Sequence, residues 1–151
     1  MSFTARIRRA PGGVRLDLSE RERELLRWVI HEVVELLDEL EDPAVQRLFP
    51  RAHEDDDLER QYRDLAGEQL VSGRRRALDT LAQTLGRTML SPEEADAWLR
   101  GLNDARLVFG TRLDVREDFD WDDVGFDHPQ AQELALYAYL SSLQAQLVEA
   151  L

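Results

Sequence analysis

The sequence contains no cysteine and no lysine, so every one of its 19 basic residues is arginine. The absence of cysteine excludes disulfides, thiolate nucleophiles, cysteine zinc sites and thiol redox switches. No stretch approaches the roughly 20 apolar residues of a membrane span. No long apolar run follows the first arginines, so we also expect no signal peptide. These absences together predict a cytoplasmic protein that does not enter a membrane.

Basic residues are also scarce relative to acids, which number 31 and leave a net charge of −12. Such a chain repels nucleic acid and acidic membranes unless its bases cluster, so we expect no membrane partner and disfavour nucleic acid. The alternative is a DNA-binding regulator that uses the arginines of the N-terminal hairpin, Arg6, Arg8, Arg9 and Arg15. Apolar residues make up 43% of the 151 residues, which suffices for the core of one domain over residues 1–151. A basic surface on another protein is the partner that this charge favours.

Periodicity predicts a mainly α fold, a helical bundle of five to six helices with an N-terminal β-hairpin. Residues 3–18 alternate in polarity around Pro11-Gly12-Gly13, which is typical of a hairpin. Capping boxes at Ser19–Glu22 and Ser91–Glu94 predict two helix starts. Whether the chain breaks near Ser72-Gly73 stays open. Within residues 19–113 we expect one helix that runs to about residue 41, a short helix from residue 42, and helices at 56–71, 74–86 and 91 to about 113. An acidic linker at 114–127 and a terminal helix at 128–150 follow.

The acidic linker contains E-D-F-D-W-D-D-V-G-F-D-H-P at 117–129, which resembles the start of a calcium loop. Such a loop needs glycine at its sixth position and glutamate at its twelfth, where this sequence has Asp123 and Pro129. We therefore predict no calcium site. Aromatic residues between acids are typical of segments that dock on a basic groove. This makes Phe119, Trp121 and Phe126 candidate partner contacts, unless they pack on their own helices.

No residue set specifies a reaction, and we predict no catalytic residue, no cofactor and no metal site. The acids after His53 are consecutive, so they spread around a helix axis rather than converging on a metal. We expect one of them to cap the helix that follows. The alternative is a small metal-dependent hydrolase that uses these acids with His53 or His128.

Three stretches resemble the actinobacterial AosR-like oxidative stress regulator family, formerly known as a domain of unknown function. They are R-L-F-P at 47–50, Asp57 with Y-R-D-L at 62–65, and A-W-L-R-G-L-N-D-A-R-L-V-F-G-T-R-L at 97–113. The resemblance covers nearly the whole chain and implies a non-enzymatic regulator that acts through protein–protein contacts on stress transcription. Gene neighbourhoods in the family suggest an alternative, an accessory factor of Clp-type proteolysis. The family's redox role relies on a C-x-x-x-C pair, so this chain lacks that cysteine switch.

The 97–113 block supplies a second set of candidate partner contacts. Asn103 and Asp104 are poor helix formers inside a helical pattern, so they require another reason to be there. Asp104 lies four residues from Arg100, which predicts an ion pair between them. The alternative to a partner face is an internal polar clamp to the hairpin or linker. The candidates are Arg100, Asn103, Asp104, Arg106 and Arg112, and a homodimer also stays open.

Overall fold

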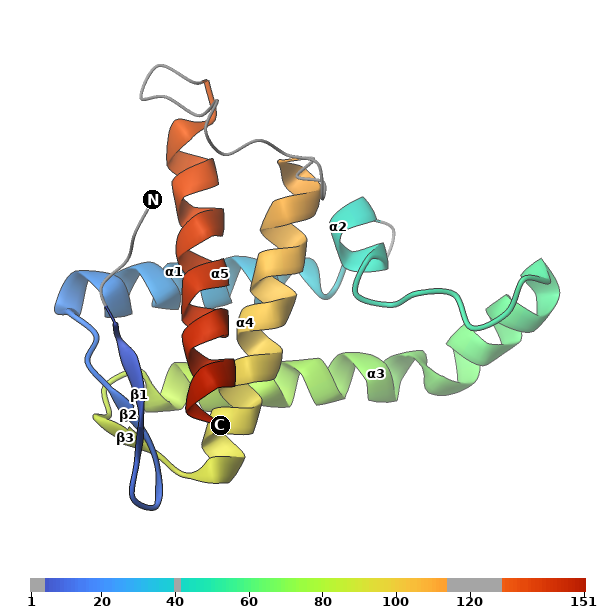
Figure 1. Cartoon of the computed structure of the whole chain (residues 1–151). Coiled ribbons are helices and arrows are strands. Elements are labelled where there is room, and N and C mark those ends of the chain that lie inside the picture. Colours follow the sequence, from blue (N-terminus) through green and yellow to red (C-terminus); the bar gives the residue numbers. More distant parts are fainter. Residues whose placement is uncertain (1–4, 40–41, 114–128) are drawn as a thin grey trace.

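The computed structural model describes residues 5–39, 42–113 and 129–151. Helices dominate this part of the chain, and a small antiparallel sheet lies at its N-terminal end (Figure 1). The mainly helical fold predicted from the sequence is confirmed. The elements are β1 (Ile7–Ala10), β2 (Gly13–Leu16), α1 (Glu20–Leu36), α2 (Pro43–Gln46), α3 (Asp56–Thr84), β3 (Met89–Leu90), α4 (Pro92–Arg112) and α5 (Ala131–Ala150).

The predicted hairpin is present, and it pairs with a third strand that the sequence analysis missed. Strands β1 and β2 are antiparallel, and β2 pairs in turn with β3, in the order β1-β2-β3. Gly12 has a φ of +85°, which suits glycine at the hairpin turn. A Cβ on Gly13 would lie 1.9 Å from the carbonyl oxygen of Leu90, so β3 runs against this glycine. With two residues, β3 is too short to produce an alternating pattern.

Side chains predicted to cap helices do so. The Ser19 hydroxyl accepts from the Glu22 N–H at 3.2 Å, and the Ser91 hydroxyl accepts from the Glu94 N–H at 3.1 Å. Both glutamates accept the N–H of their serine in return, which completes both capping boxes. The Asp42 carboxylate caps α2 in the same manner, by accepting from the Ala44 N–H at 2.8 Å. Local sequence therefore fixes where these helices begin.

Helix ends were predicted less well than helix starts. Helix α1 ends at Leu36 rather than near residue 41, and α5 begins at Ala131 rather than at 128. The predicted acidic linker at 114–127 and His128 lie outside the described residues.

Helix α3 is continuous through Gly67 and Gly73, which answers the open question of a break. Its C-terminal half packs in the bundle, where Leu78 and Leu81 are fully buried. Its N-terminal end projects from the bundle (Figure 1), and we call residues 56–68 the α3 arm. Leu65 on this arm is 85% exposed, whereas buried Glu59 accepts the Ala52 N–H at 2.8 Å and thereby ties the arm to the segment after α2.

Helix α4 is the centre of the bundle, because it contacts α1, α2, α3, α5 and the sheet. Trp98 on α4 is completely buried, and its indole N–H donates to the Thr84 hydroxyl at 2.6 Å. Most of the buried apolar residues join in one core around it. No helix in the described ranges is long and apolar enough to cross a membrane.

The hairpin is attached to α5 near the C-terminal end of the chain. The side-chain oxygen of Gln146 accepts the N–H groups of Arg6 at 2.6 Å and Ile7 at 3.0 Å. The Arg9 guanidinium donates to the carbonyls of Ala150 at 3.2 Å and Leu151 at 3.0 Å. Polar bonds therefore join segments that are about as distant in sequence as the chain allows.

Candidate functional site

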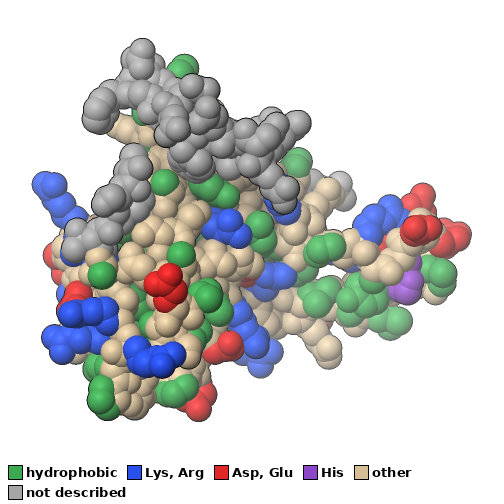
Figure 2. All heavy atoms as spheres, in the orientation of Figure 1, with side chains coloured by type: hydrophobic (Ala, Val, Ile, Leu, Met, Phe, Trp, Pro, Cys, Tyr) green, Lys and Arg blue, Asp and Glu red, His purple; other side chains and the backbone are tan. Residues whose placement is uncertain are grey.

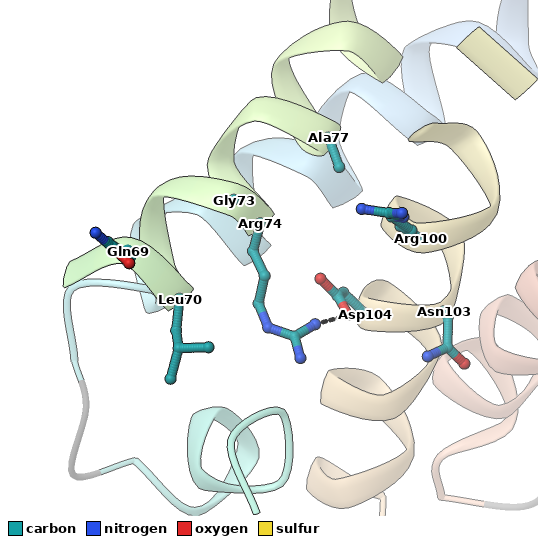
Figure 3. Close-up of a pocket in the computed structure, with 8 residues that line it drawn as sticks. All are labelled: Gln69, Leu70, Gly73, Arg74, Ala77, Arg100, Asn103 and Asp104. Carbon is teal, nitrogen blue, oxygen red and sulfur yellow. Dashed lines mark hydrogen bonds and ion pairs between the residues drawn. The ribbon is translucent and has the colours of Figure 1, made fainter. Parts of the chain in front are cut away.

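The candidate site is a groove between α3 and α4 with a volume of about 370 Å³. It collects three of the residues that the sequence had marked as candidate contacts, and five that it had not (Figure 3). The groove is lined by Gln69, Leu70, Gly73, Arg74, Ala77, Arg100, Asn103 and Asp104.

Small residues on α3 create the groove. Gly73 and Ala77 leave little side-chain volume on the α3 wall, and a Cβ on Gly73 would meet no atom within 4 Å. The same two helices are tightly packed at Gly101, where a Cβ would lie 2.8 Å from Leu81 Cδ1. The groove therefore opens beside a close helix–helix contact that holds its walls in place.

The lining of the groove includes an ion pair between partly exposed Arg74 on α3 and buried Asp104 on α4 (Figure 3). Asp104 is 2% exposed, and this burial raises the pKa of its carboxyl group, while the Arg74 guanidinium acts in the opposite direction. Arg74 also donates to the Leu48 carbonyl at 2.6 Å and lies over the Phe49 ring, 4.9 Å from its centroid. These contacts tie α4 and α3 to the segment after α2.

The predicted pairing of Asp104 with Arg100 is therefore wrong. Arg100 pairs instead with Asp96, at 3.1 Å between Nε and Oδ2. Asp104 turns toward α3, where burial makes a close cation necessary and Arg74 supplies it. The side chain of Arg100 remains 72% exposed on the groove wall. The alternative of an internal clamp describes Asp104 better, although the clamp reaches α3 and not the hairpin.

Two further candidates connect α4 with α5. The Asn103 side-chain oxygen accepts from Gln144 Nε2 at 3.1 Å and from Arg106 Nη2 at 3.4 Å. Arg106 also donates to the Tyr137 hydroxyl at 3.4 Å. Of these, Asn103 lines the groove and Arg106 does not.

The remaining candidates are not at the groove. Arg112 is exposed in the last turn of α4 and does not line it. Phe119, Trp121 and Phe126 lie outside the described residues. The sequence carries no signal that one arginine of the run at 74–76 is partly buried, because its partner is 30 residues away.

The acids near His53 behave as predicted for a helix start. The Asp55 carboxylate accepts the N–H groups of Asp57 at 2.9 Å and Leu58 at 3.1 Å, which caps α3. The His53 ring lies edge-on to Tyr62, with 5.6 Å between centroids. Across the described part of the chain, no three His, Asp or Glu side chains are grouped as metal ligands would be.

The fold and groove do not by themselves name a family, but comparison with known proteins does. A family model described as a domain of unknown function, DUF2017, matches residues 4–151. The chain belongs to this family. The resemblance drawn from residues 47–50, 57–65 and 97–113 is thereby confirmed.

Curated DUF2017 relatives carry a regulatory name. A protein of Mycobacterium leprae named as an oxidative stress regulator AosR is 32% identical over 129 residues, which are 74% of this chain and 59% of that protein. The Oxidative stress regulator AosR of Mycobacterium tuberculosis H37Rv is 29% identical over 125 residues, 71% of this chain and 57% of that protein. The chain thus aligns with less than two thirds of the length of these relatives. No solved structure matches it.

Proposed function

We propose that this DUF2017 protein is a non-enzymatic regulator that binds a protein component of stress transcription through the groove between α3 and α4. The names of its relatives support the regulatory role. The observation that carries the binding role is the groove itself, whose lining combines apolar Leu70 and Ala77 with the exposed guanidinium of Arg100. Apolar side chains together with arginine are common at protein-binding surfaces.

The chemistry of the groove supports binding over catalysis. Among the described residues, its lining contains no serine, threonine, histidine or cysteine that could act as a nucleophile. The one carboxylate among these lining residues, Asp104, accepts a charge-assisted hydrogen bond from Arg74. A partner therefore meets a preformed surface and not a reactive group.

The absence of cysteine shapes how such a regulator would work. No thiol switch is available, so the contact itself does not depend on the redox state of this chain. We propose that the amount of protein, or a change in its partner, sets the response. The acidic excess favours a partner with a basic surface. In this proposal Arg100 pairs with an acid at the rim, and Phe119, Trp121 and Phe126 are further contacts.

A complementation experiment tests the groove. A strain that lacks the gene would receive wild type, Arg100→Glu, or Gly73→Leu, which adds a side chain at a position where a Cβ would meet no atom within 4 Å. We expect peroxide-induced transcript changes to be restored by wild type and lost with both variants. Arg21→Glu, an exposed position on α1 with the same charge change, is the control and should restore the response. Full restoration by both groove variants at equal protein levels would exclude the groove.

A further inference from the structure

The α3 arm presents an apolar stripe with two exposed leucines, and the tyrosine between them contacts the His53 ring. Leu58 is 51% exposed and Leu65 is 85% exposed, and half-buried Tyr62 lies between them at helical spacing. Figure 2 shows hydrophobic side chains gathered along this projecting helix. We call Leu58, Tyr62 and Leu65 the arm stripe. Apolar groups in this arrangement usually mark an interaction site.

The arm is also a helix that needs support. Isolated helices of this length are marginal in water, and a glycine inside a helix costs about 1 kcal/mol relative to alanine. Gly67 and Gly73 both lie within α3. A surface that packs against the exposed leucines of the arm would therefore stabilise this part of the helix.

The rest of α3 supplies a surface that fits the stripe. The same helix face continues as Gln69, Ser72 and Arg76, which line a shallow hollow together with Glu68. A second hollow flanks this region on the side of α1 and is lined in part by Gly67, Val71 and Ser72. Projecting leucines and a shallow hollow with mainly polar side chains thus lie along one face of one helix.

Charge along α3 specifies the direction in which two such helices would pair. Residues 56–68 contain five acids and two arginines, whereas residues 69–84 contain three arginines and one acid. Antiparallel pairing sets the acidic half of each helix beside the exposed Arg76 of the other, whereas Arg74 and Arg75 pair with Asp104 and Asp38 of their own chain. Parallel pairing would set like charges together, which is unfavourable.

We infer that α3 forms an antiparallel, twofold-symmetric contact with α3 of a second copy of this chain. Centred near Gly67, the pairing sets Leu65 against Gln69 of the second copy, Tyr62 against its Ser72 and Leu58 against its Arg76. The arm stripe of each copy packs on the continuing α3 face of the other copy, so both copies use the same surfaces, as a twofold interface requires. One helix face is smaller than the roughly 800 Å² per partner of a stable complex, so the dimer is reversible and concentration-dependent.

Sedimentation equilibrium over a concentration series tests the association. We expect wild type to shift from 17.4 kDa toward twice that mass as concentration rises. Leu65→Asp should stay at 17.4 kDa with an unchanged helical circular dichroism signal, since this side chain supports no fold contact. Val148→Asp, an exposed apolar position on α5, should dimerise as wild type does. A wild-type protein that remains monomeric throughout, or a Leu65→Asp variant that dimerises normally, would overturn the inference.

Cross-linking tests the direction, and the absence of native cysteine makes single-cysteine variants clean. In the antiparallel pair, Gln69→Cys lies near the twofold axis and should form a disulfide-linked dimer under mild oxidation. Thr80→Cys should not, because a rise of about 1.5 Å per residue leaves the two copies of residue 80 roughly 40 Å apart. Linkage at both positions would indicate parallel helices, and linkage at Thr80→Cys alone or at neither would refute this interface. Arg100→Glu should leave the dimer intact, so failure of the regulatory proposal is separable from failure of this one.

Discussion

At the scale of single residues, the pair of Arg74 and Asp104 determines how α4 is held. Asp104 is nearly inaccessible to water, while the side chain of Arg74 is 31% exposed. A carboxylate in such a place is costly unless a cation and hydrogen bonds compensate for its lost hydration. The pair is therefore more sensitive to the loss of one partner than to the loss of both.

Arg74→Met should lower the free energy of unfolding by about 3 kcal/mol, because it leaves a buried carboxylate unpaired. It also removes the donor to the Leu48 carbonyl. The double variant Arg74→Met, Asp104→Leu should be more stable than Arg74→Met alone. Urea unfolding of the two single variants and the double variant measures the coupling. Strict additivity of the two single effects would show that the pair contributes no coupling energy.

Glu94 should make the protein sensitive to acid. The Ser91 N–H donates to its carboxylate at 2.9 Å, and this bond holds the pKa of Glu94 below its ordinary value of 4.5. A lowered folded-state pKa means that the stabilisation is present above pH 4.5 and is lost as the pH falls through the folded value. Glu94→Gln should therefore lose less stability than wild type on acidification, as measured by thermal unfolding across pH. Glu93→Gln, an exposed neighbour, should follow wild type.

Residue contacts could be predicted from the sequence where the partners are close in the chain. Ser91 and Glu94 are three residues apart, so their capping box was visible as a pattern. Arg74 and Asp104 come from different helices, and only folding decides that they meet. Arg100 has one acid four residues before it, Asp96, and another four residues after it, Asp104. It pairs with Asp96, because Asp104 is buried and turns toward α3.

At the scale of helices, glycine has opposite roles in α3 and α4. Gly110 on α4 packs against Tyr137 of α5, where a Cβ would lie 2.8 Å from Cε2 of the ring. Gly101 makes the corresponding contact with α3. Gly67 on α3 faces open space. Glycine on α4 thus permits close packing, whereas Gly67 only weakens its helix.

Gly101→Ala and Gly110→Ala should each lower stability by about 1–3 kcal/mol, because the added methyl group forces the neighbouring side chain to move. Gly67→Ala should raise stability by up to about 1 kcal/mol, since alanine favours the helix and nothing obstructs it. Chemical unfolding of the three variants measures the contrast. If Gly101→Ala raised stability instead, the Leu81 side chain would be able to move aside at little energetic cost.

The sequence predicted most elements but misjudged their continuity. Gly67 and Ser72-Gly73 read as a possible interruption, because helix propensity is local and the packing that carries α3 through them is not. Strand β3 forms because Val14 and Arg15 offer it a partner edge, which its own two residues do not reveal. The spacing of apolar residues predicts which face of each helix is buried. It does not predict which other element that face packs against, because tertiary contacts determine this.

At the scale of the whole molecule, Gln146 joins the first strand to the last helix. Gln146→Leu leaves the Arg6 and Ile7 N–H groups without this acceptor, so we expect a loss of about 1–3 kcal/mol. Hydrogen exchange at these two amides should accelerate. Gln146→Glu keeps an acceptor oxygen and should protect them, while Gln132→Leu, exposed on α5, is the control. Equal exchange in Gln146→Leu and wild type would contradict a structural role for this contact.

The same join has a consequence for biosynthesis. A ribosome releases the hairpin well before α5, and the contacts of Gln146 span 139 and 140 residues. The α5-facing side of the nascent hairpin therefore stays uncovered until α5 has been synthesised. Its arginines keep that waiting edge charged, which discourages pairing with other nascent chains. Final closure of the fold thus follows the synthesis of α5.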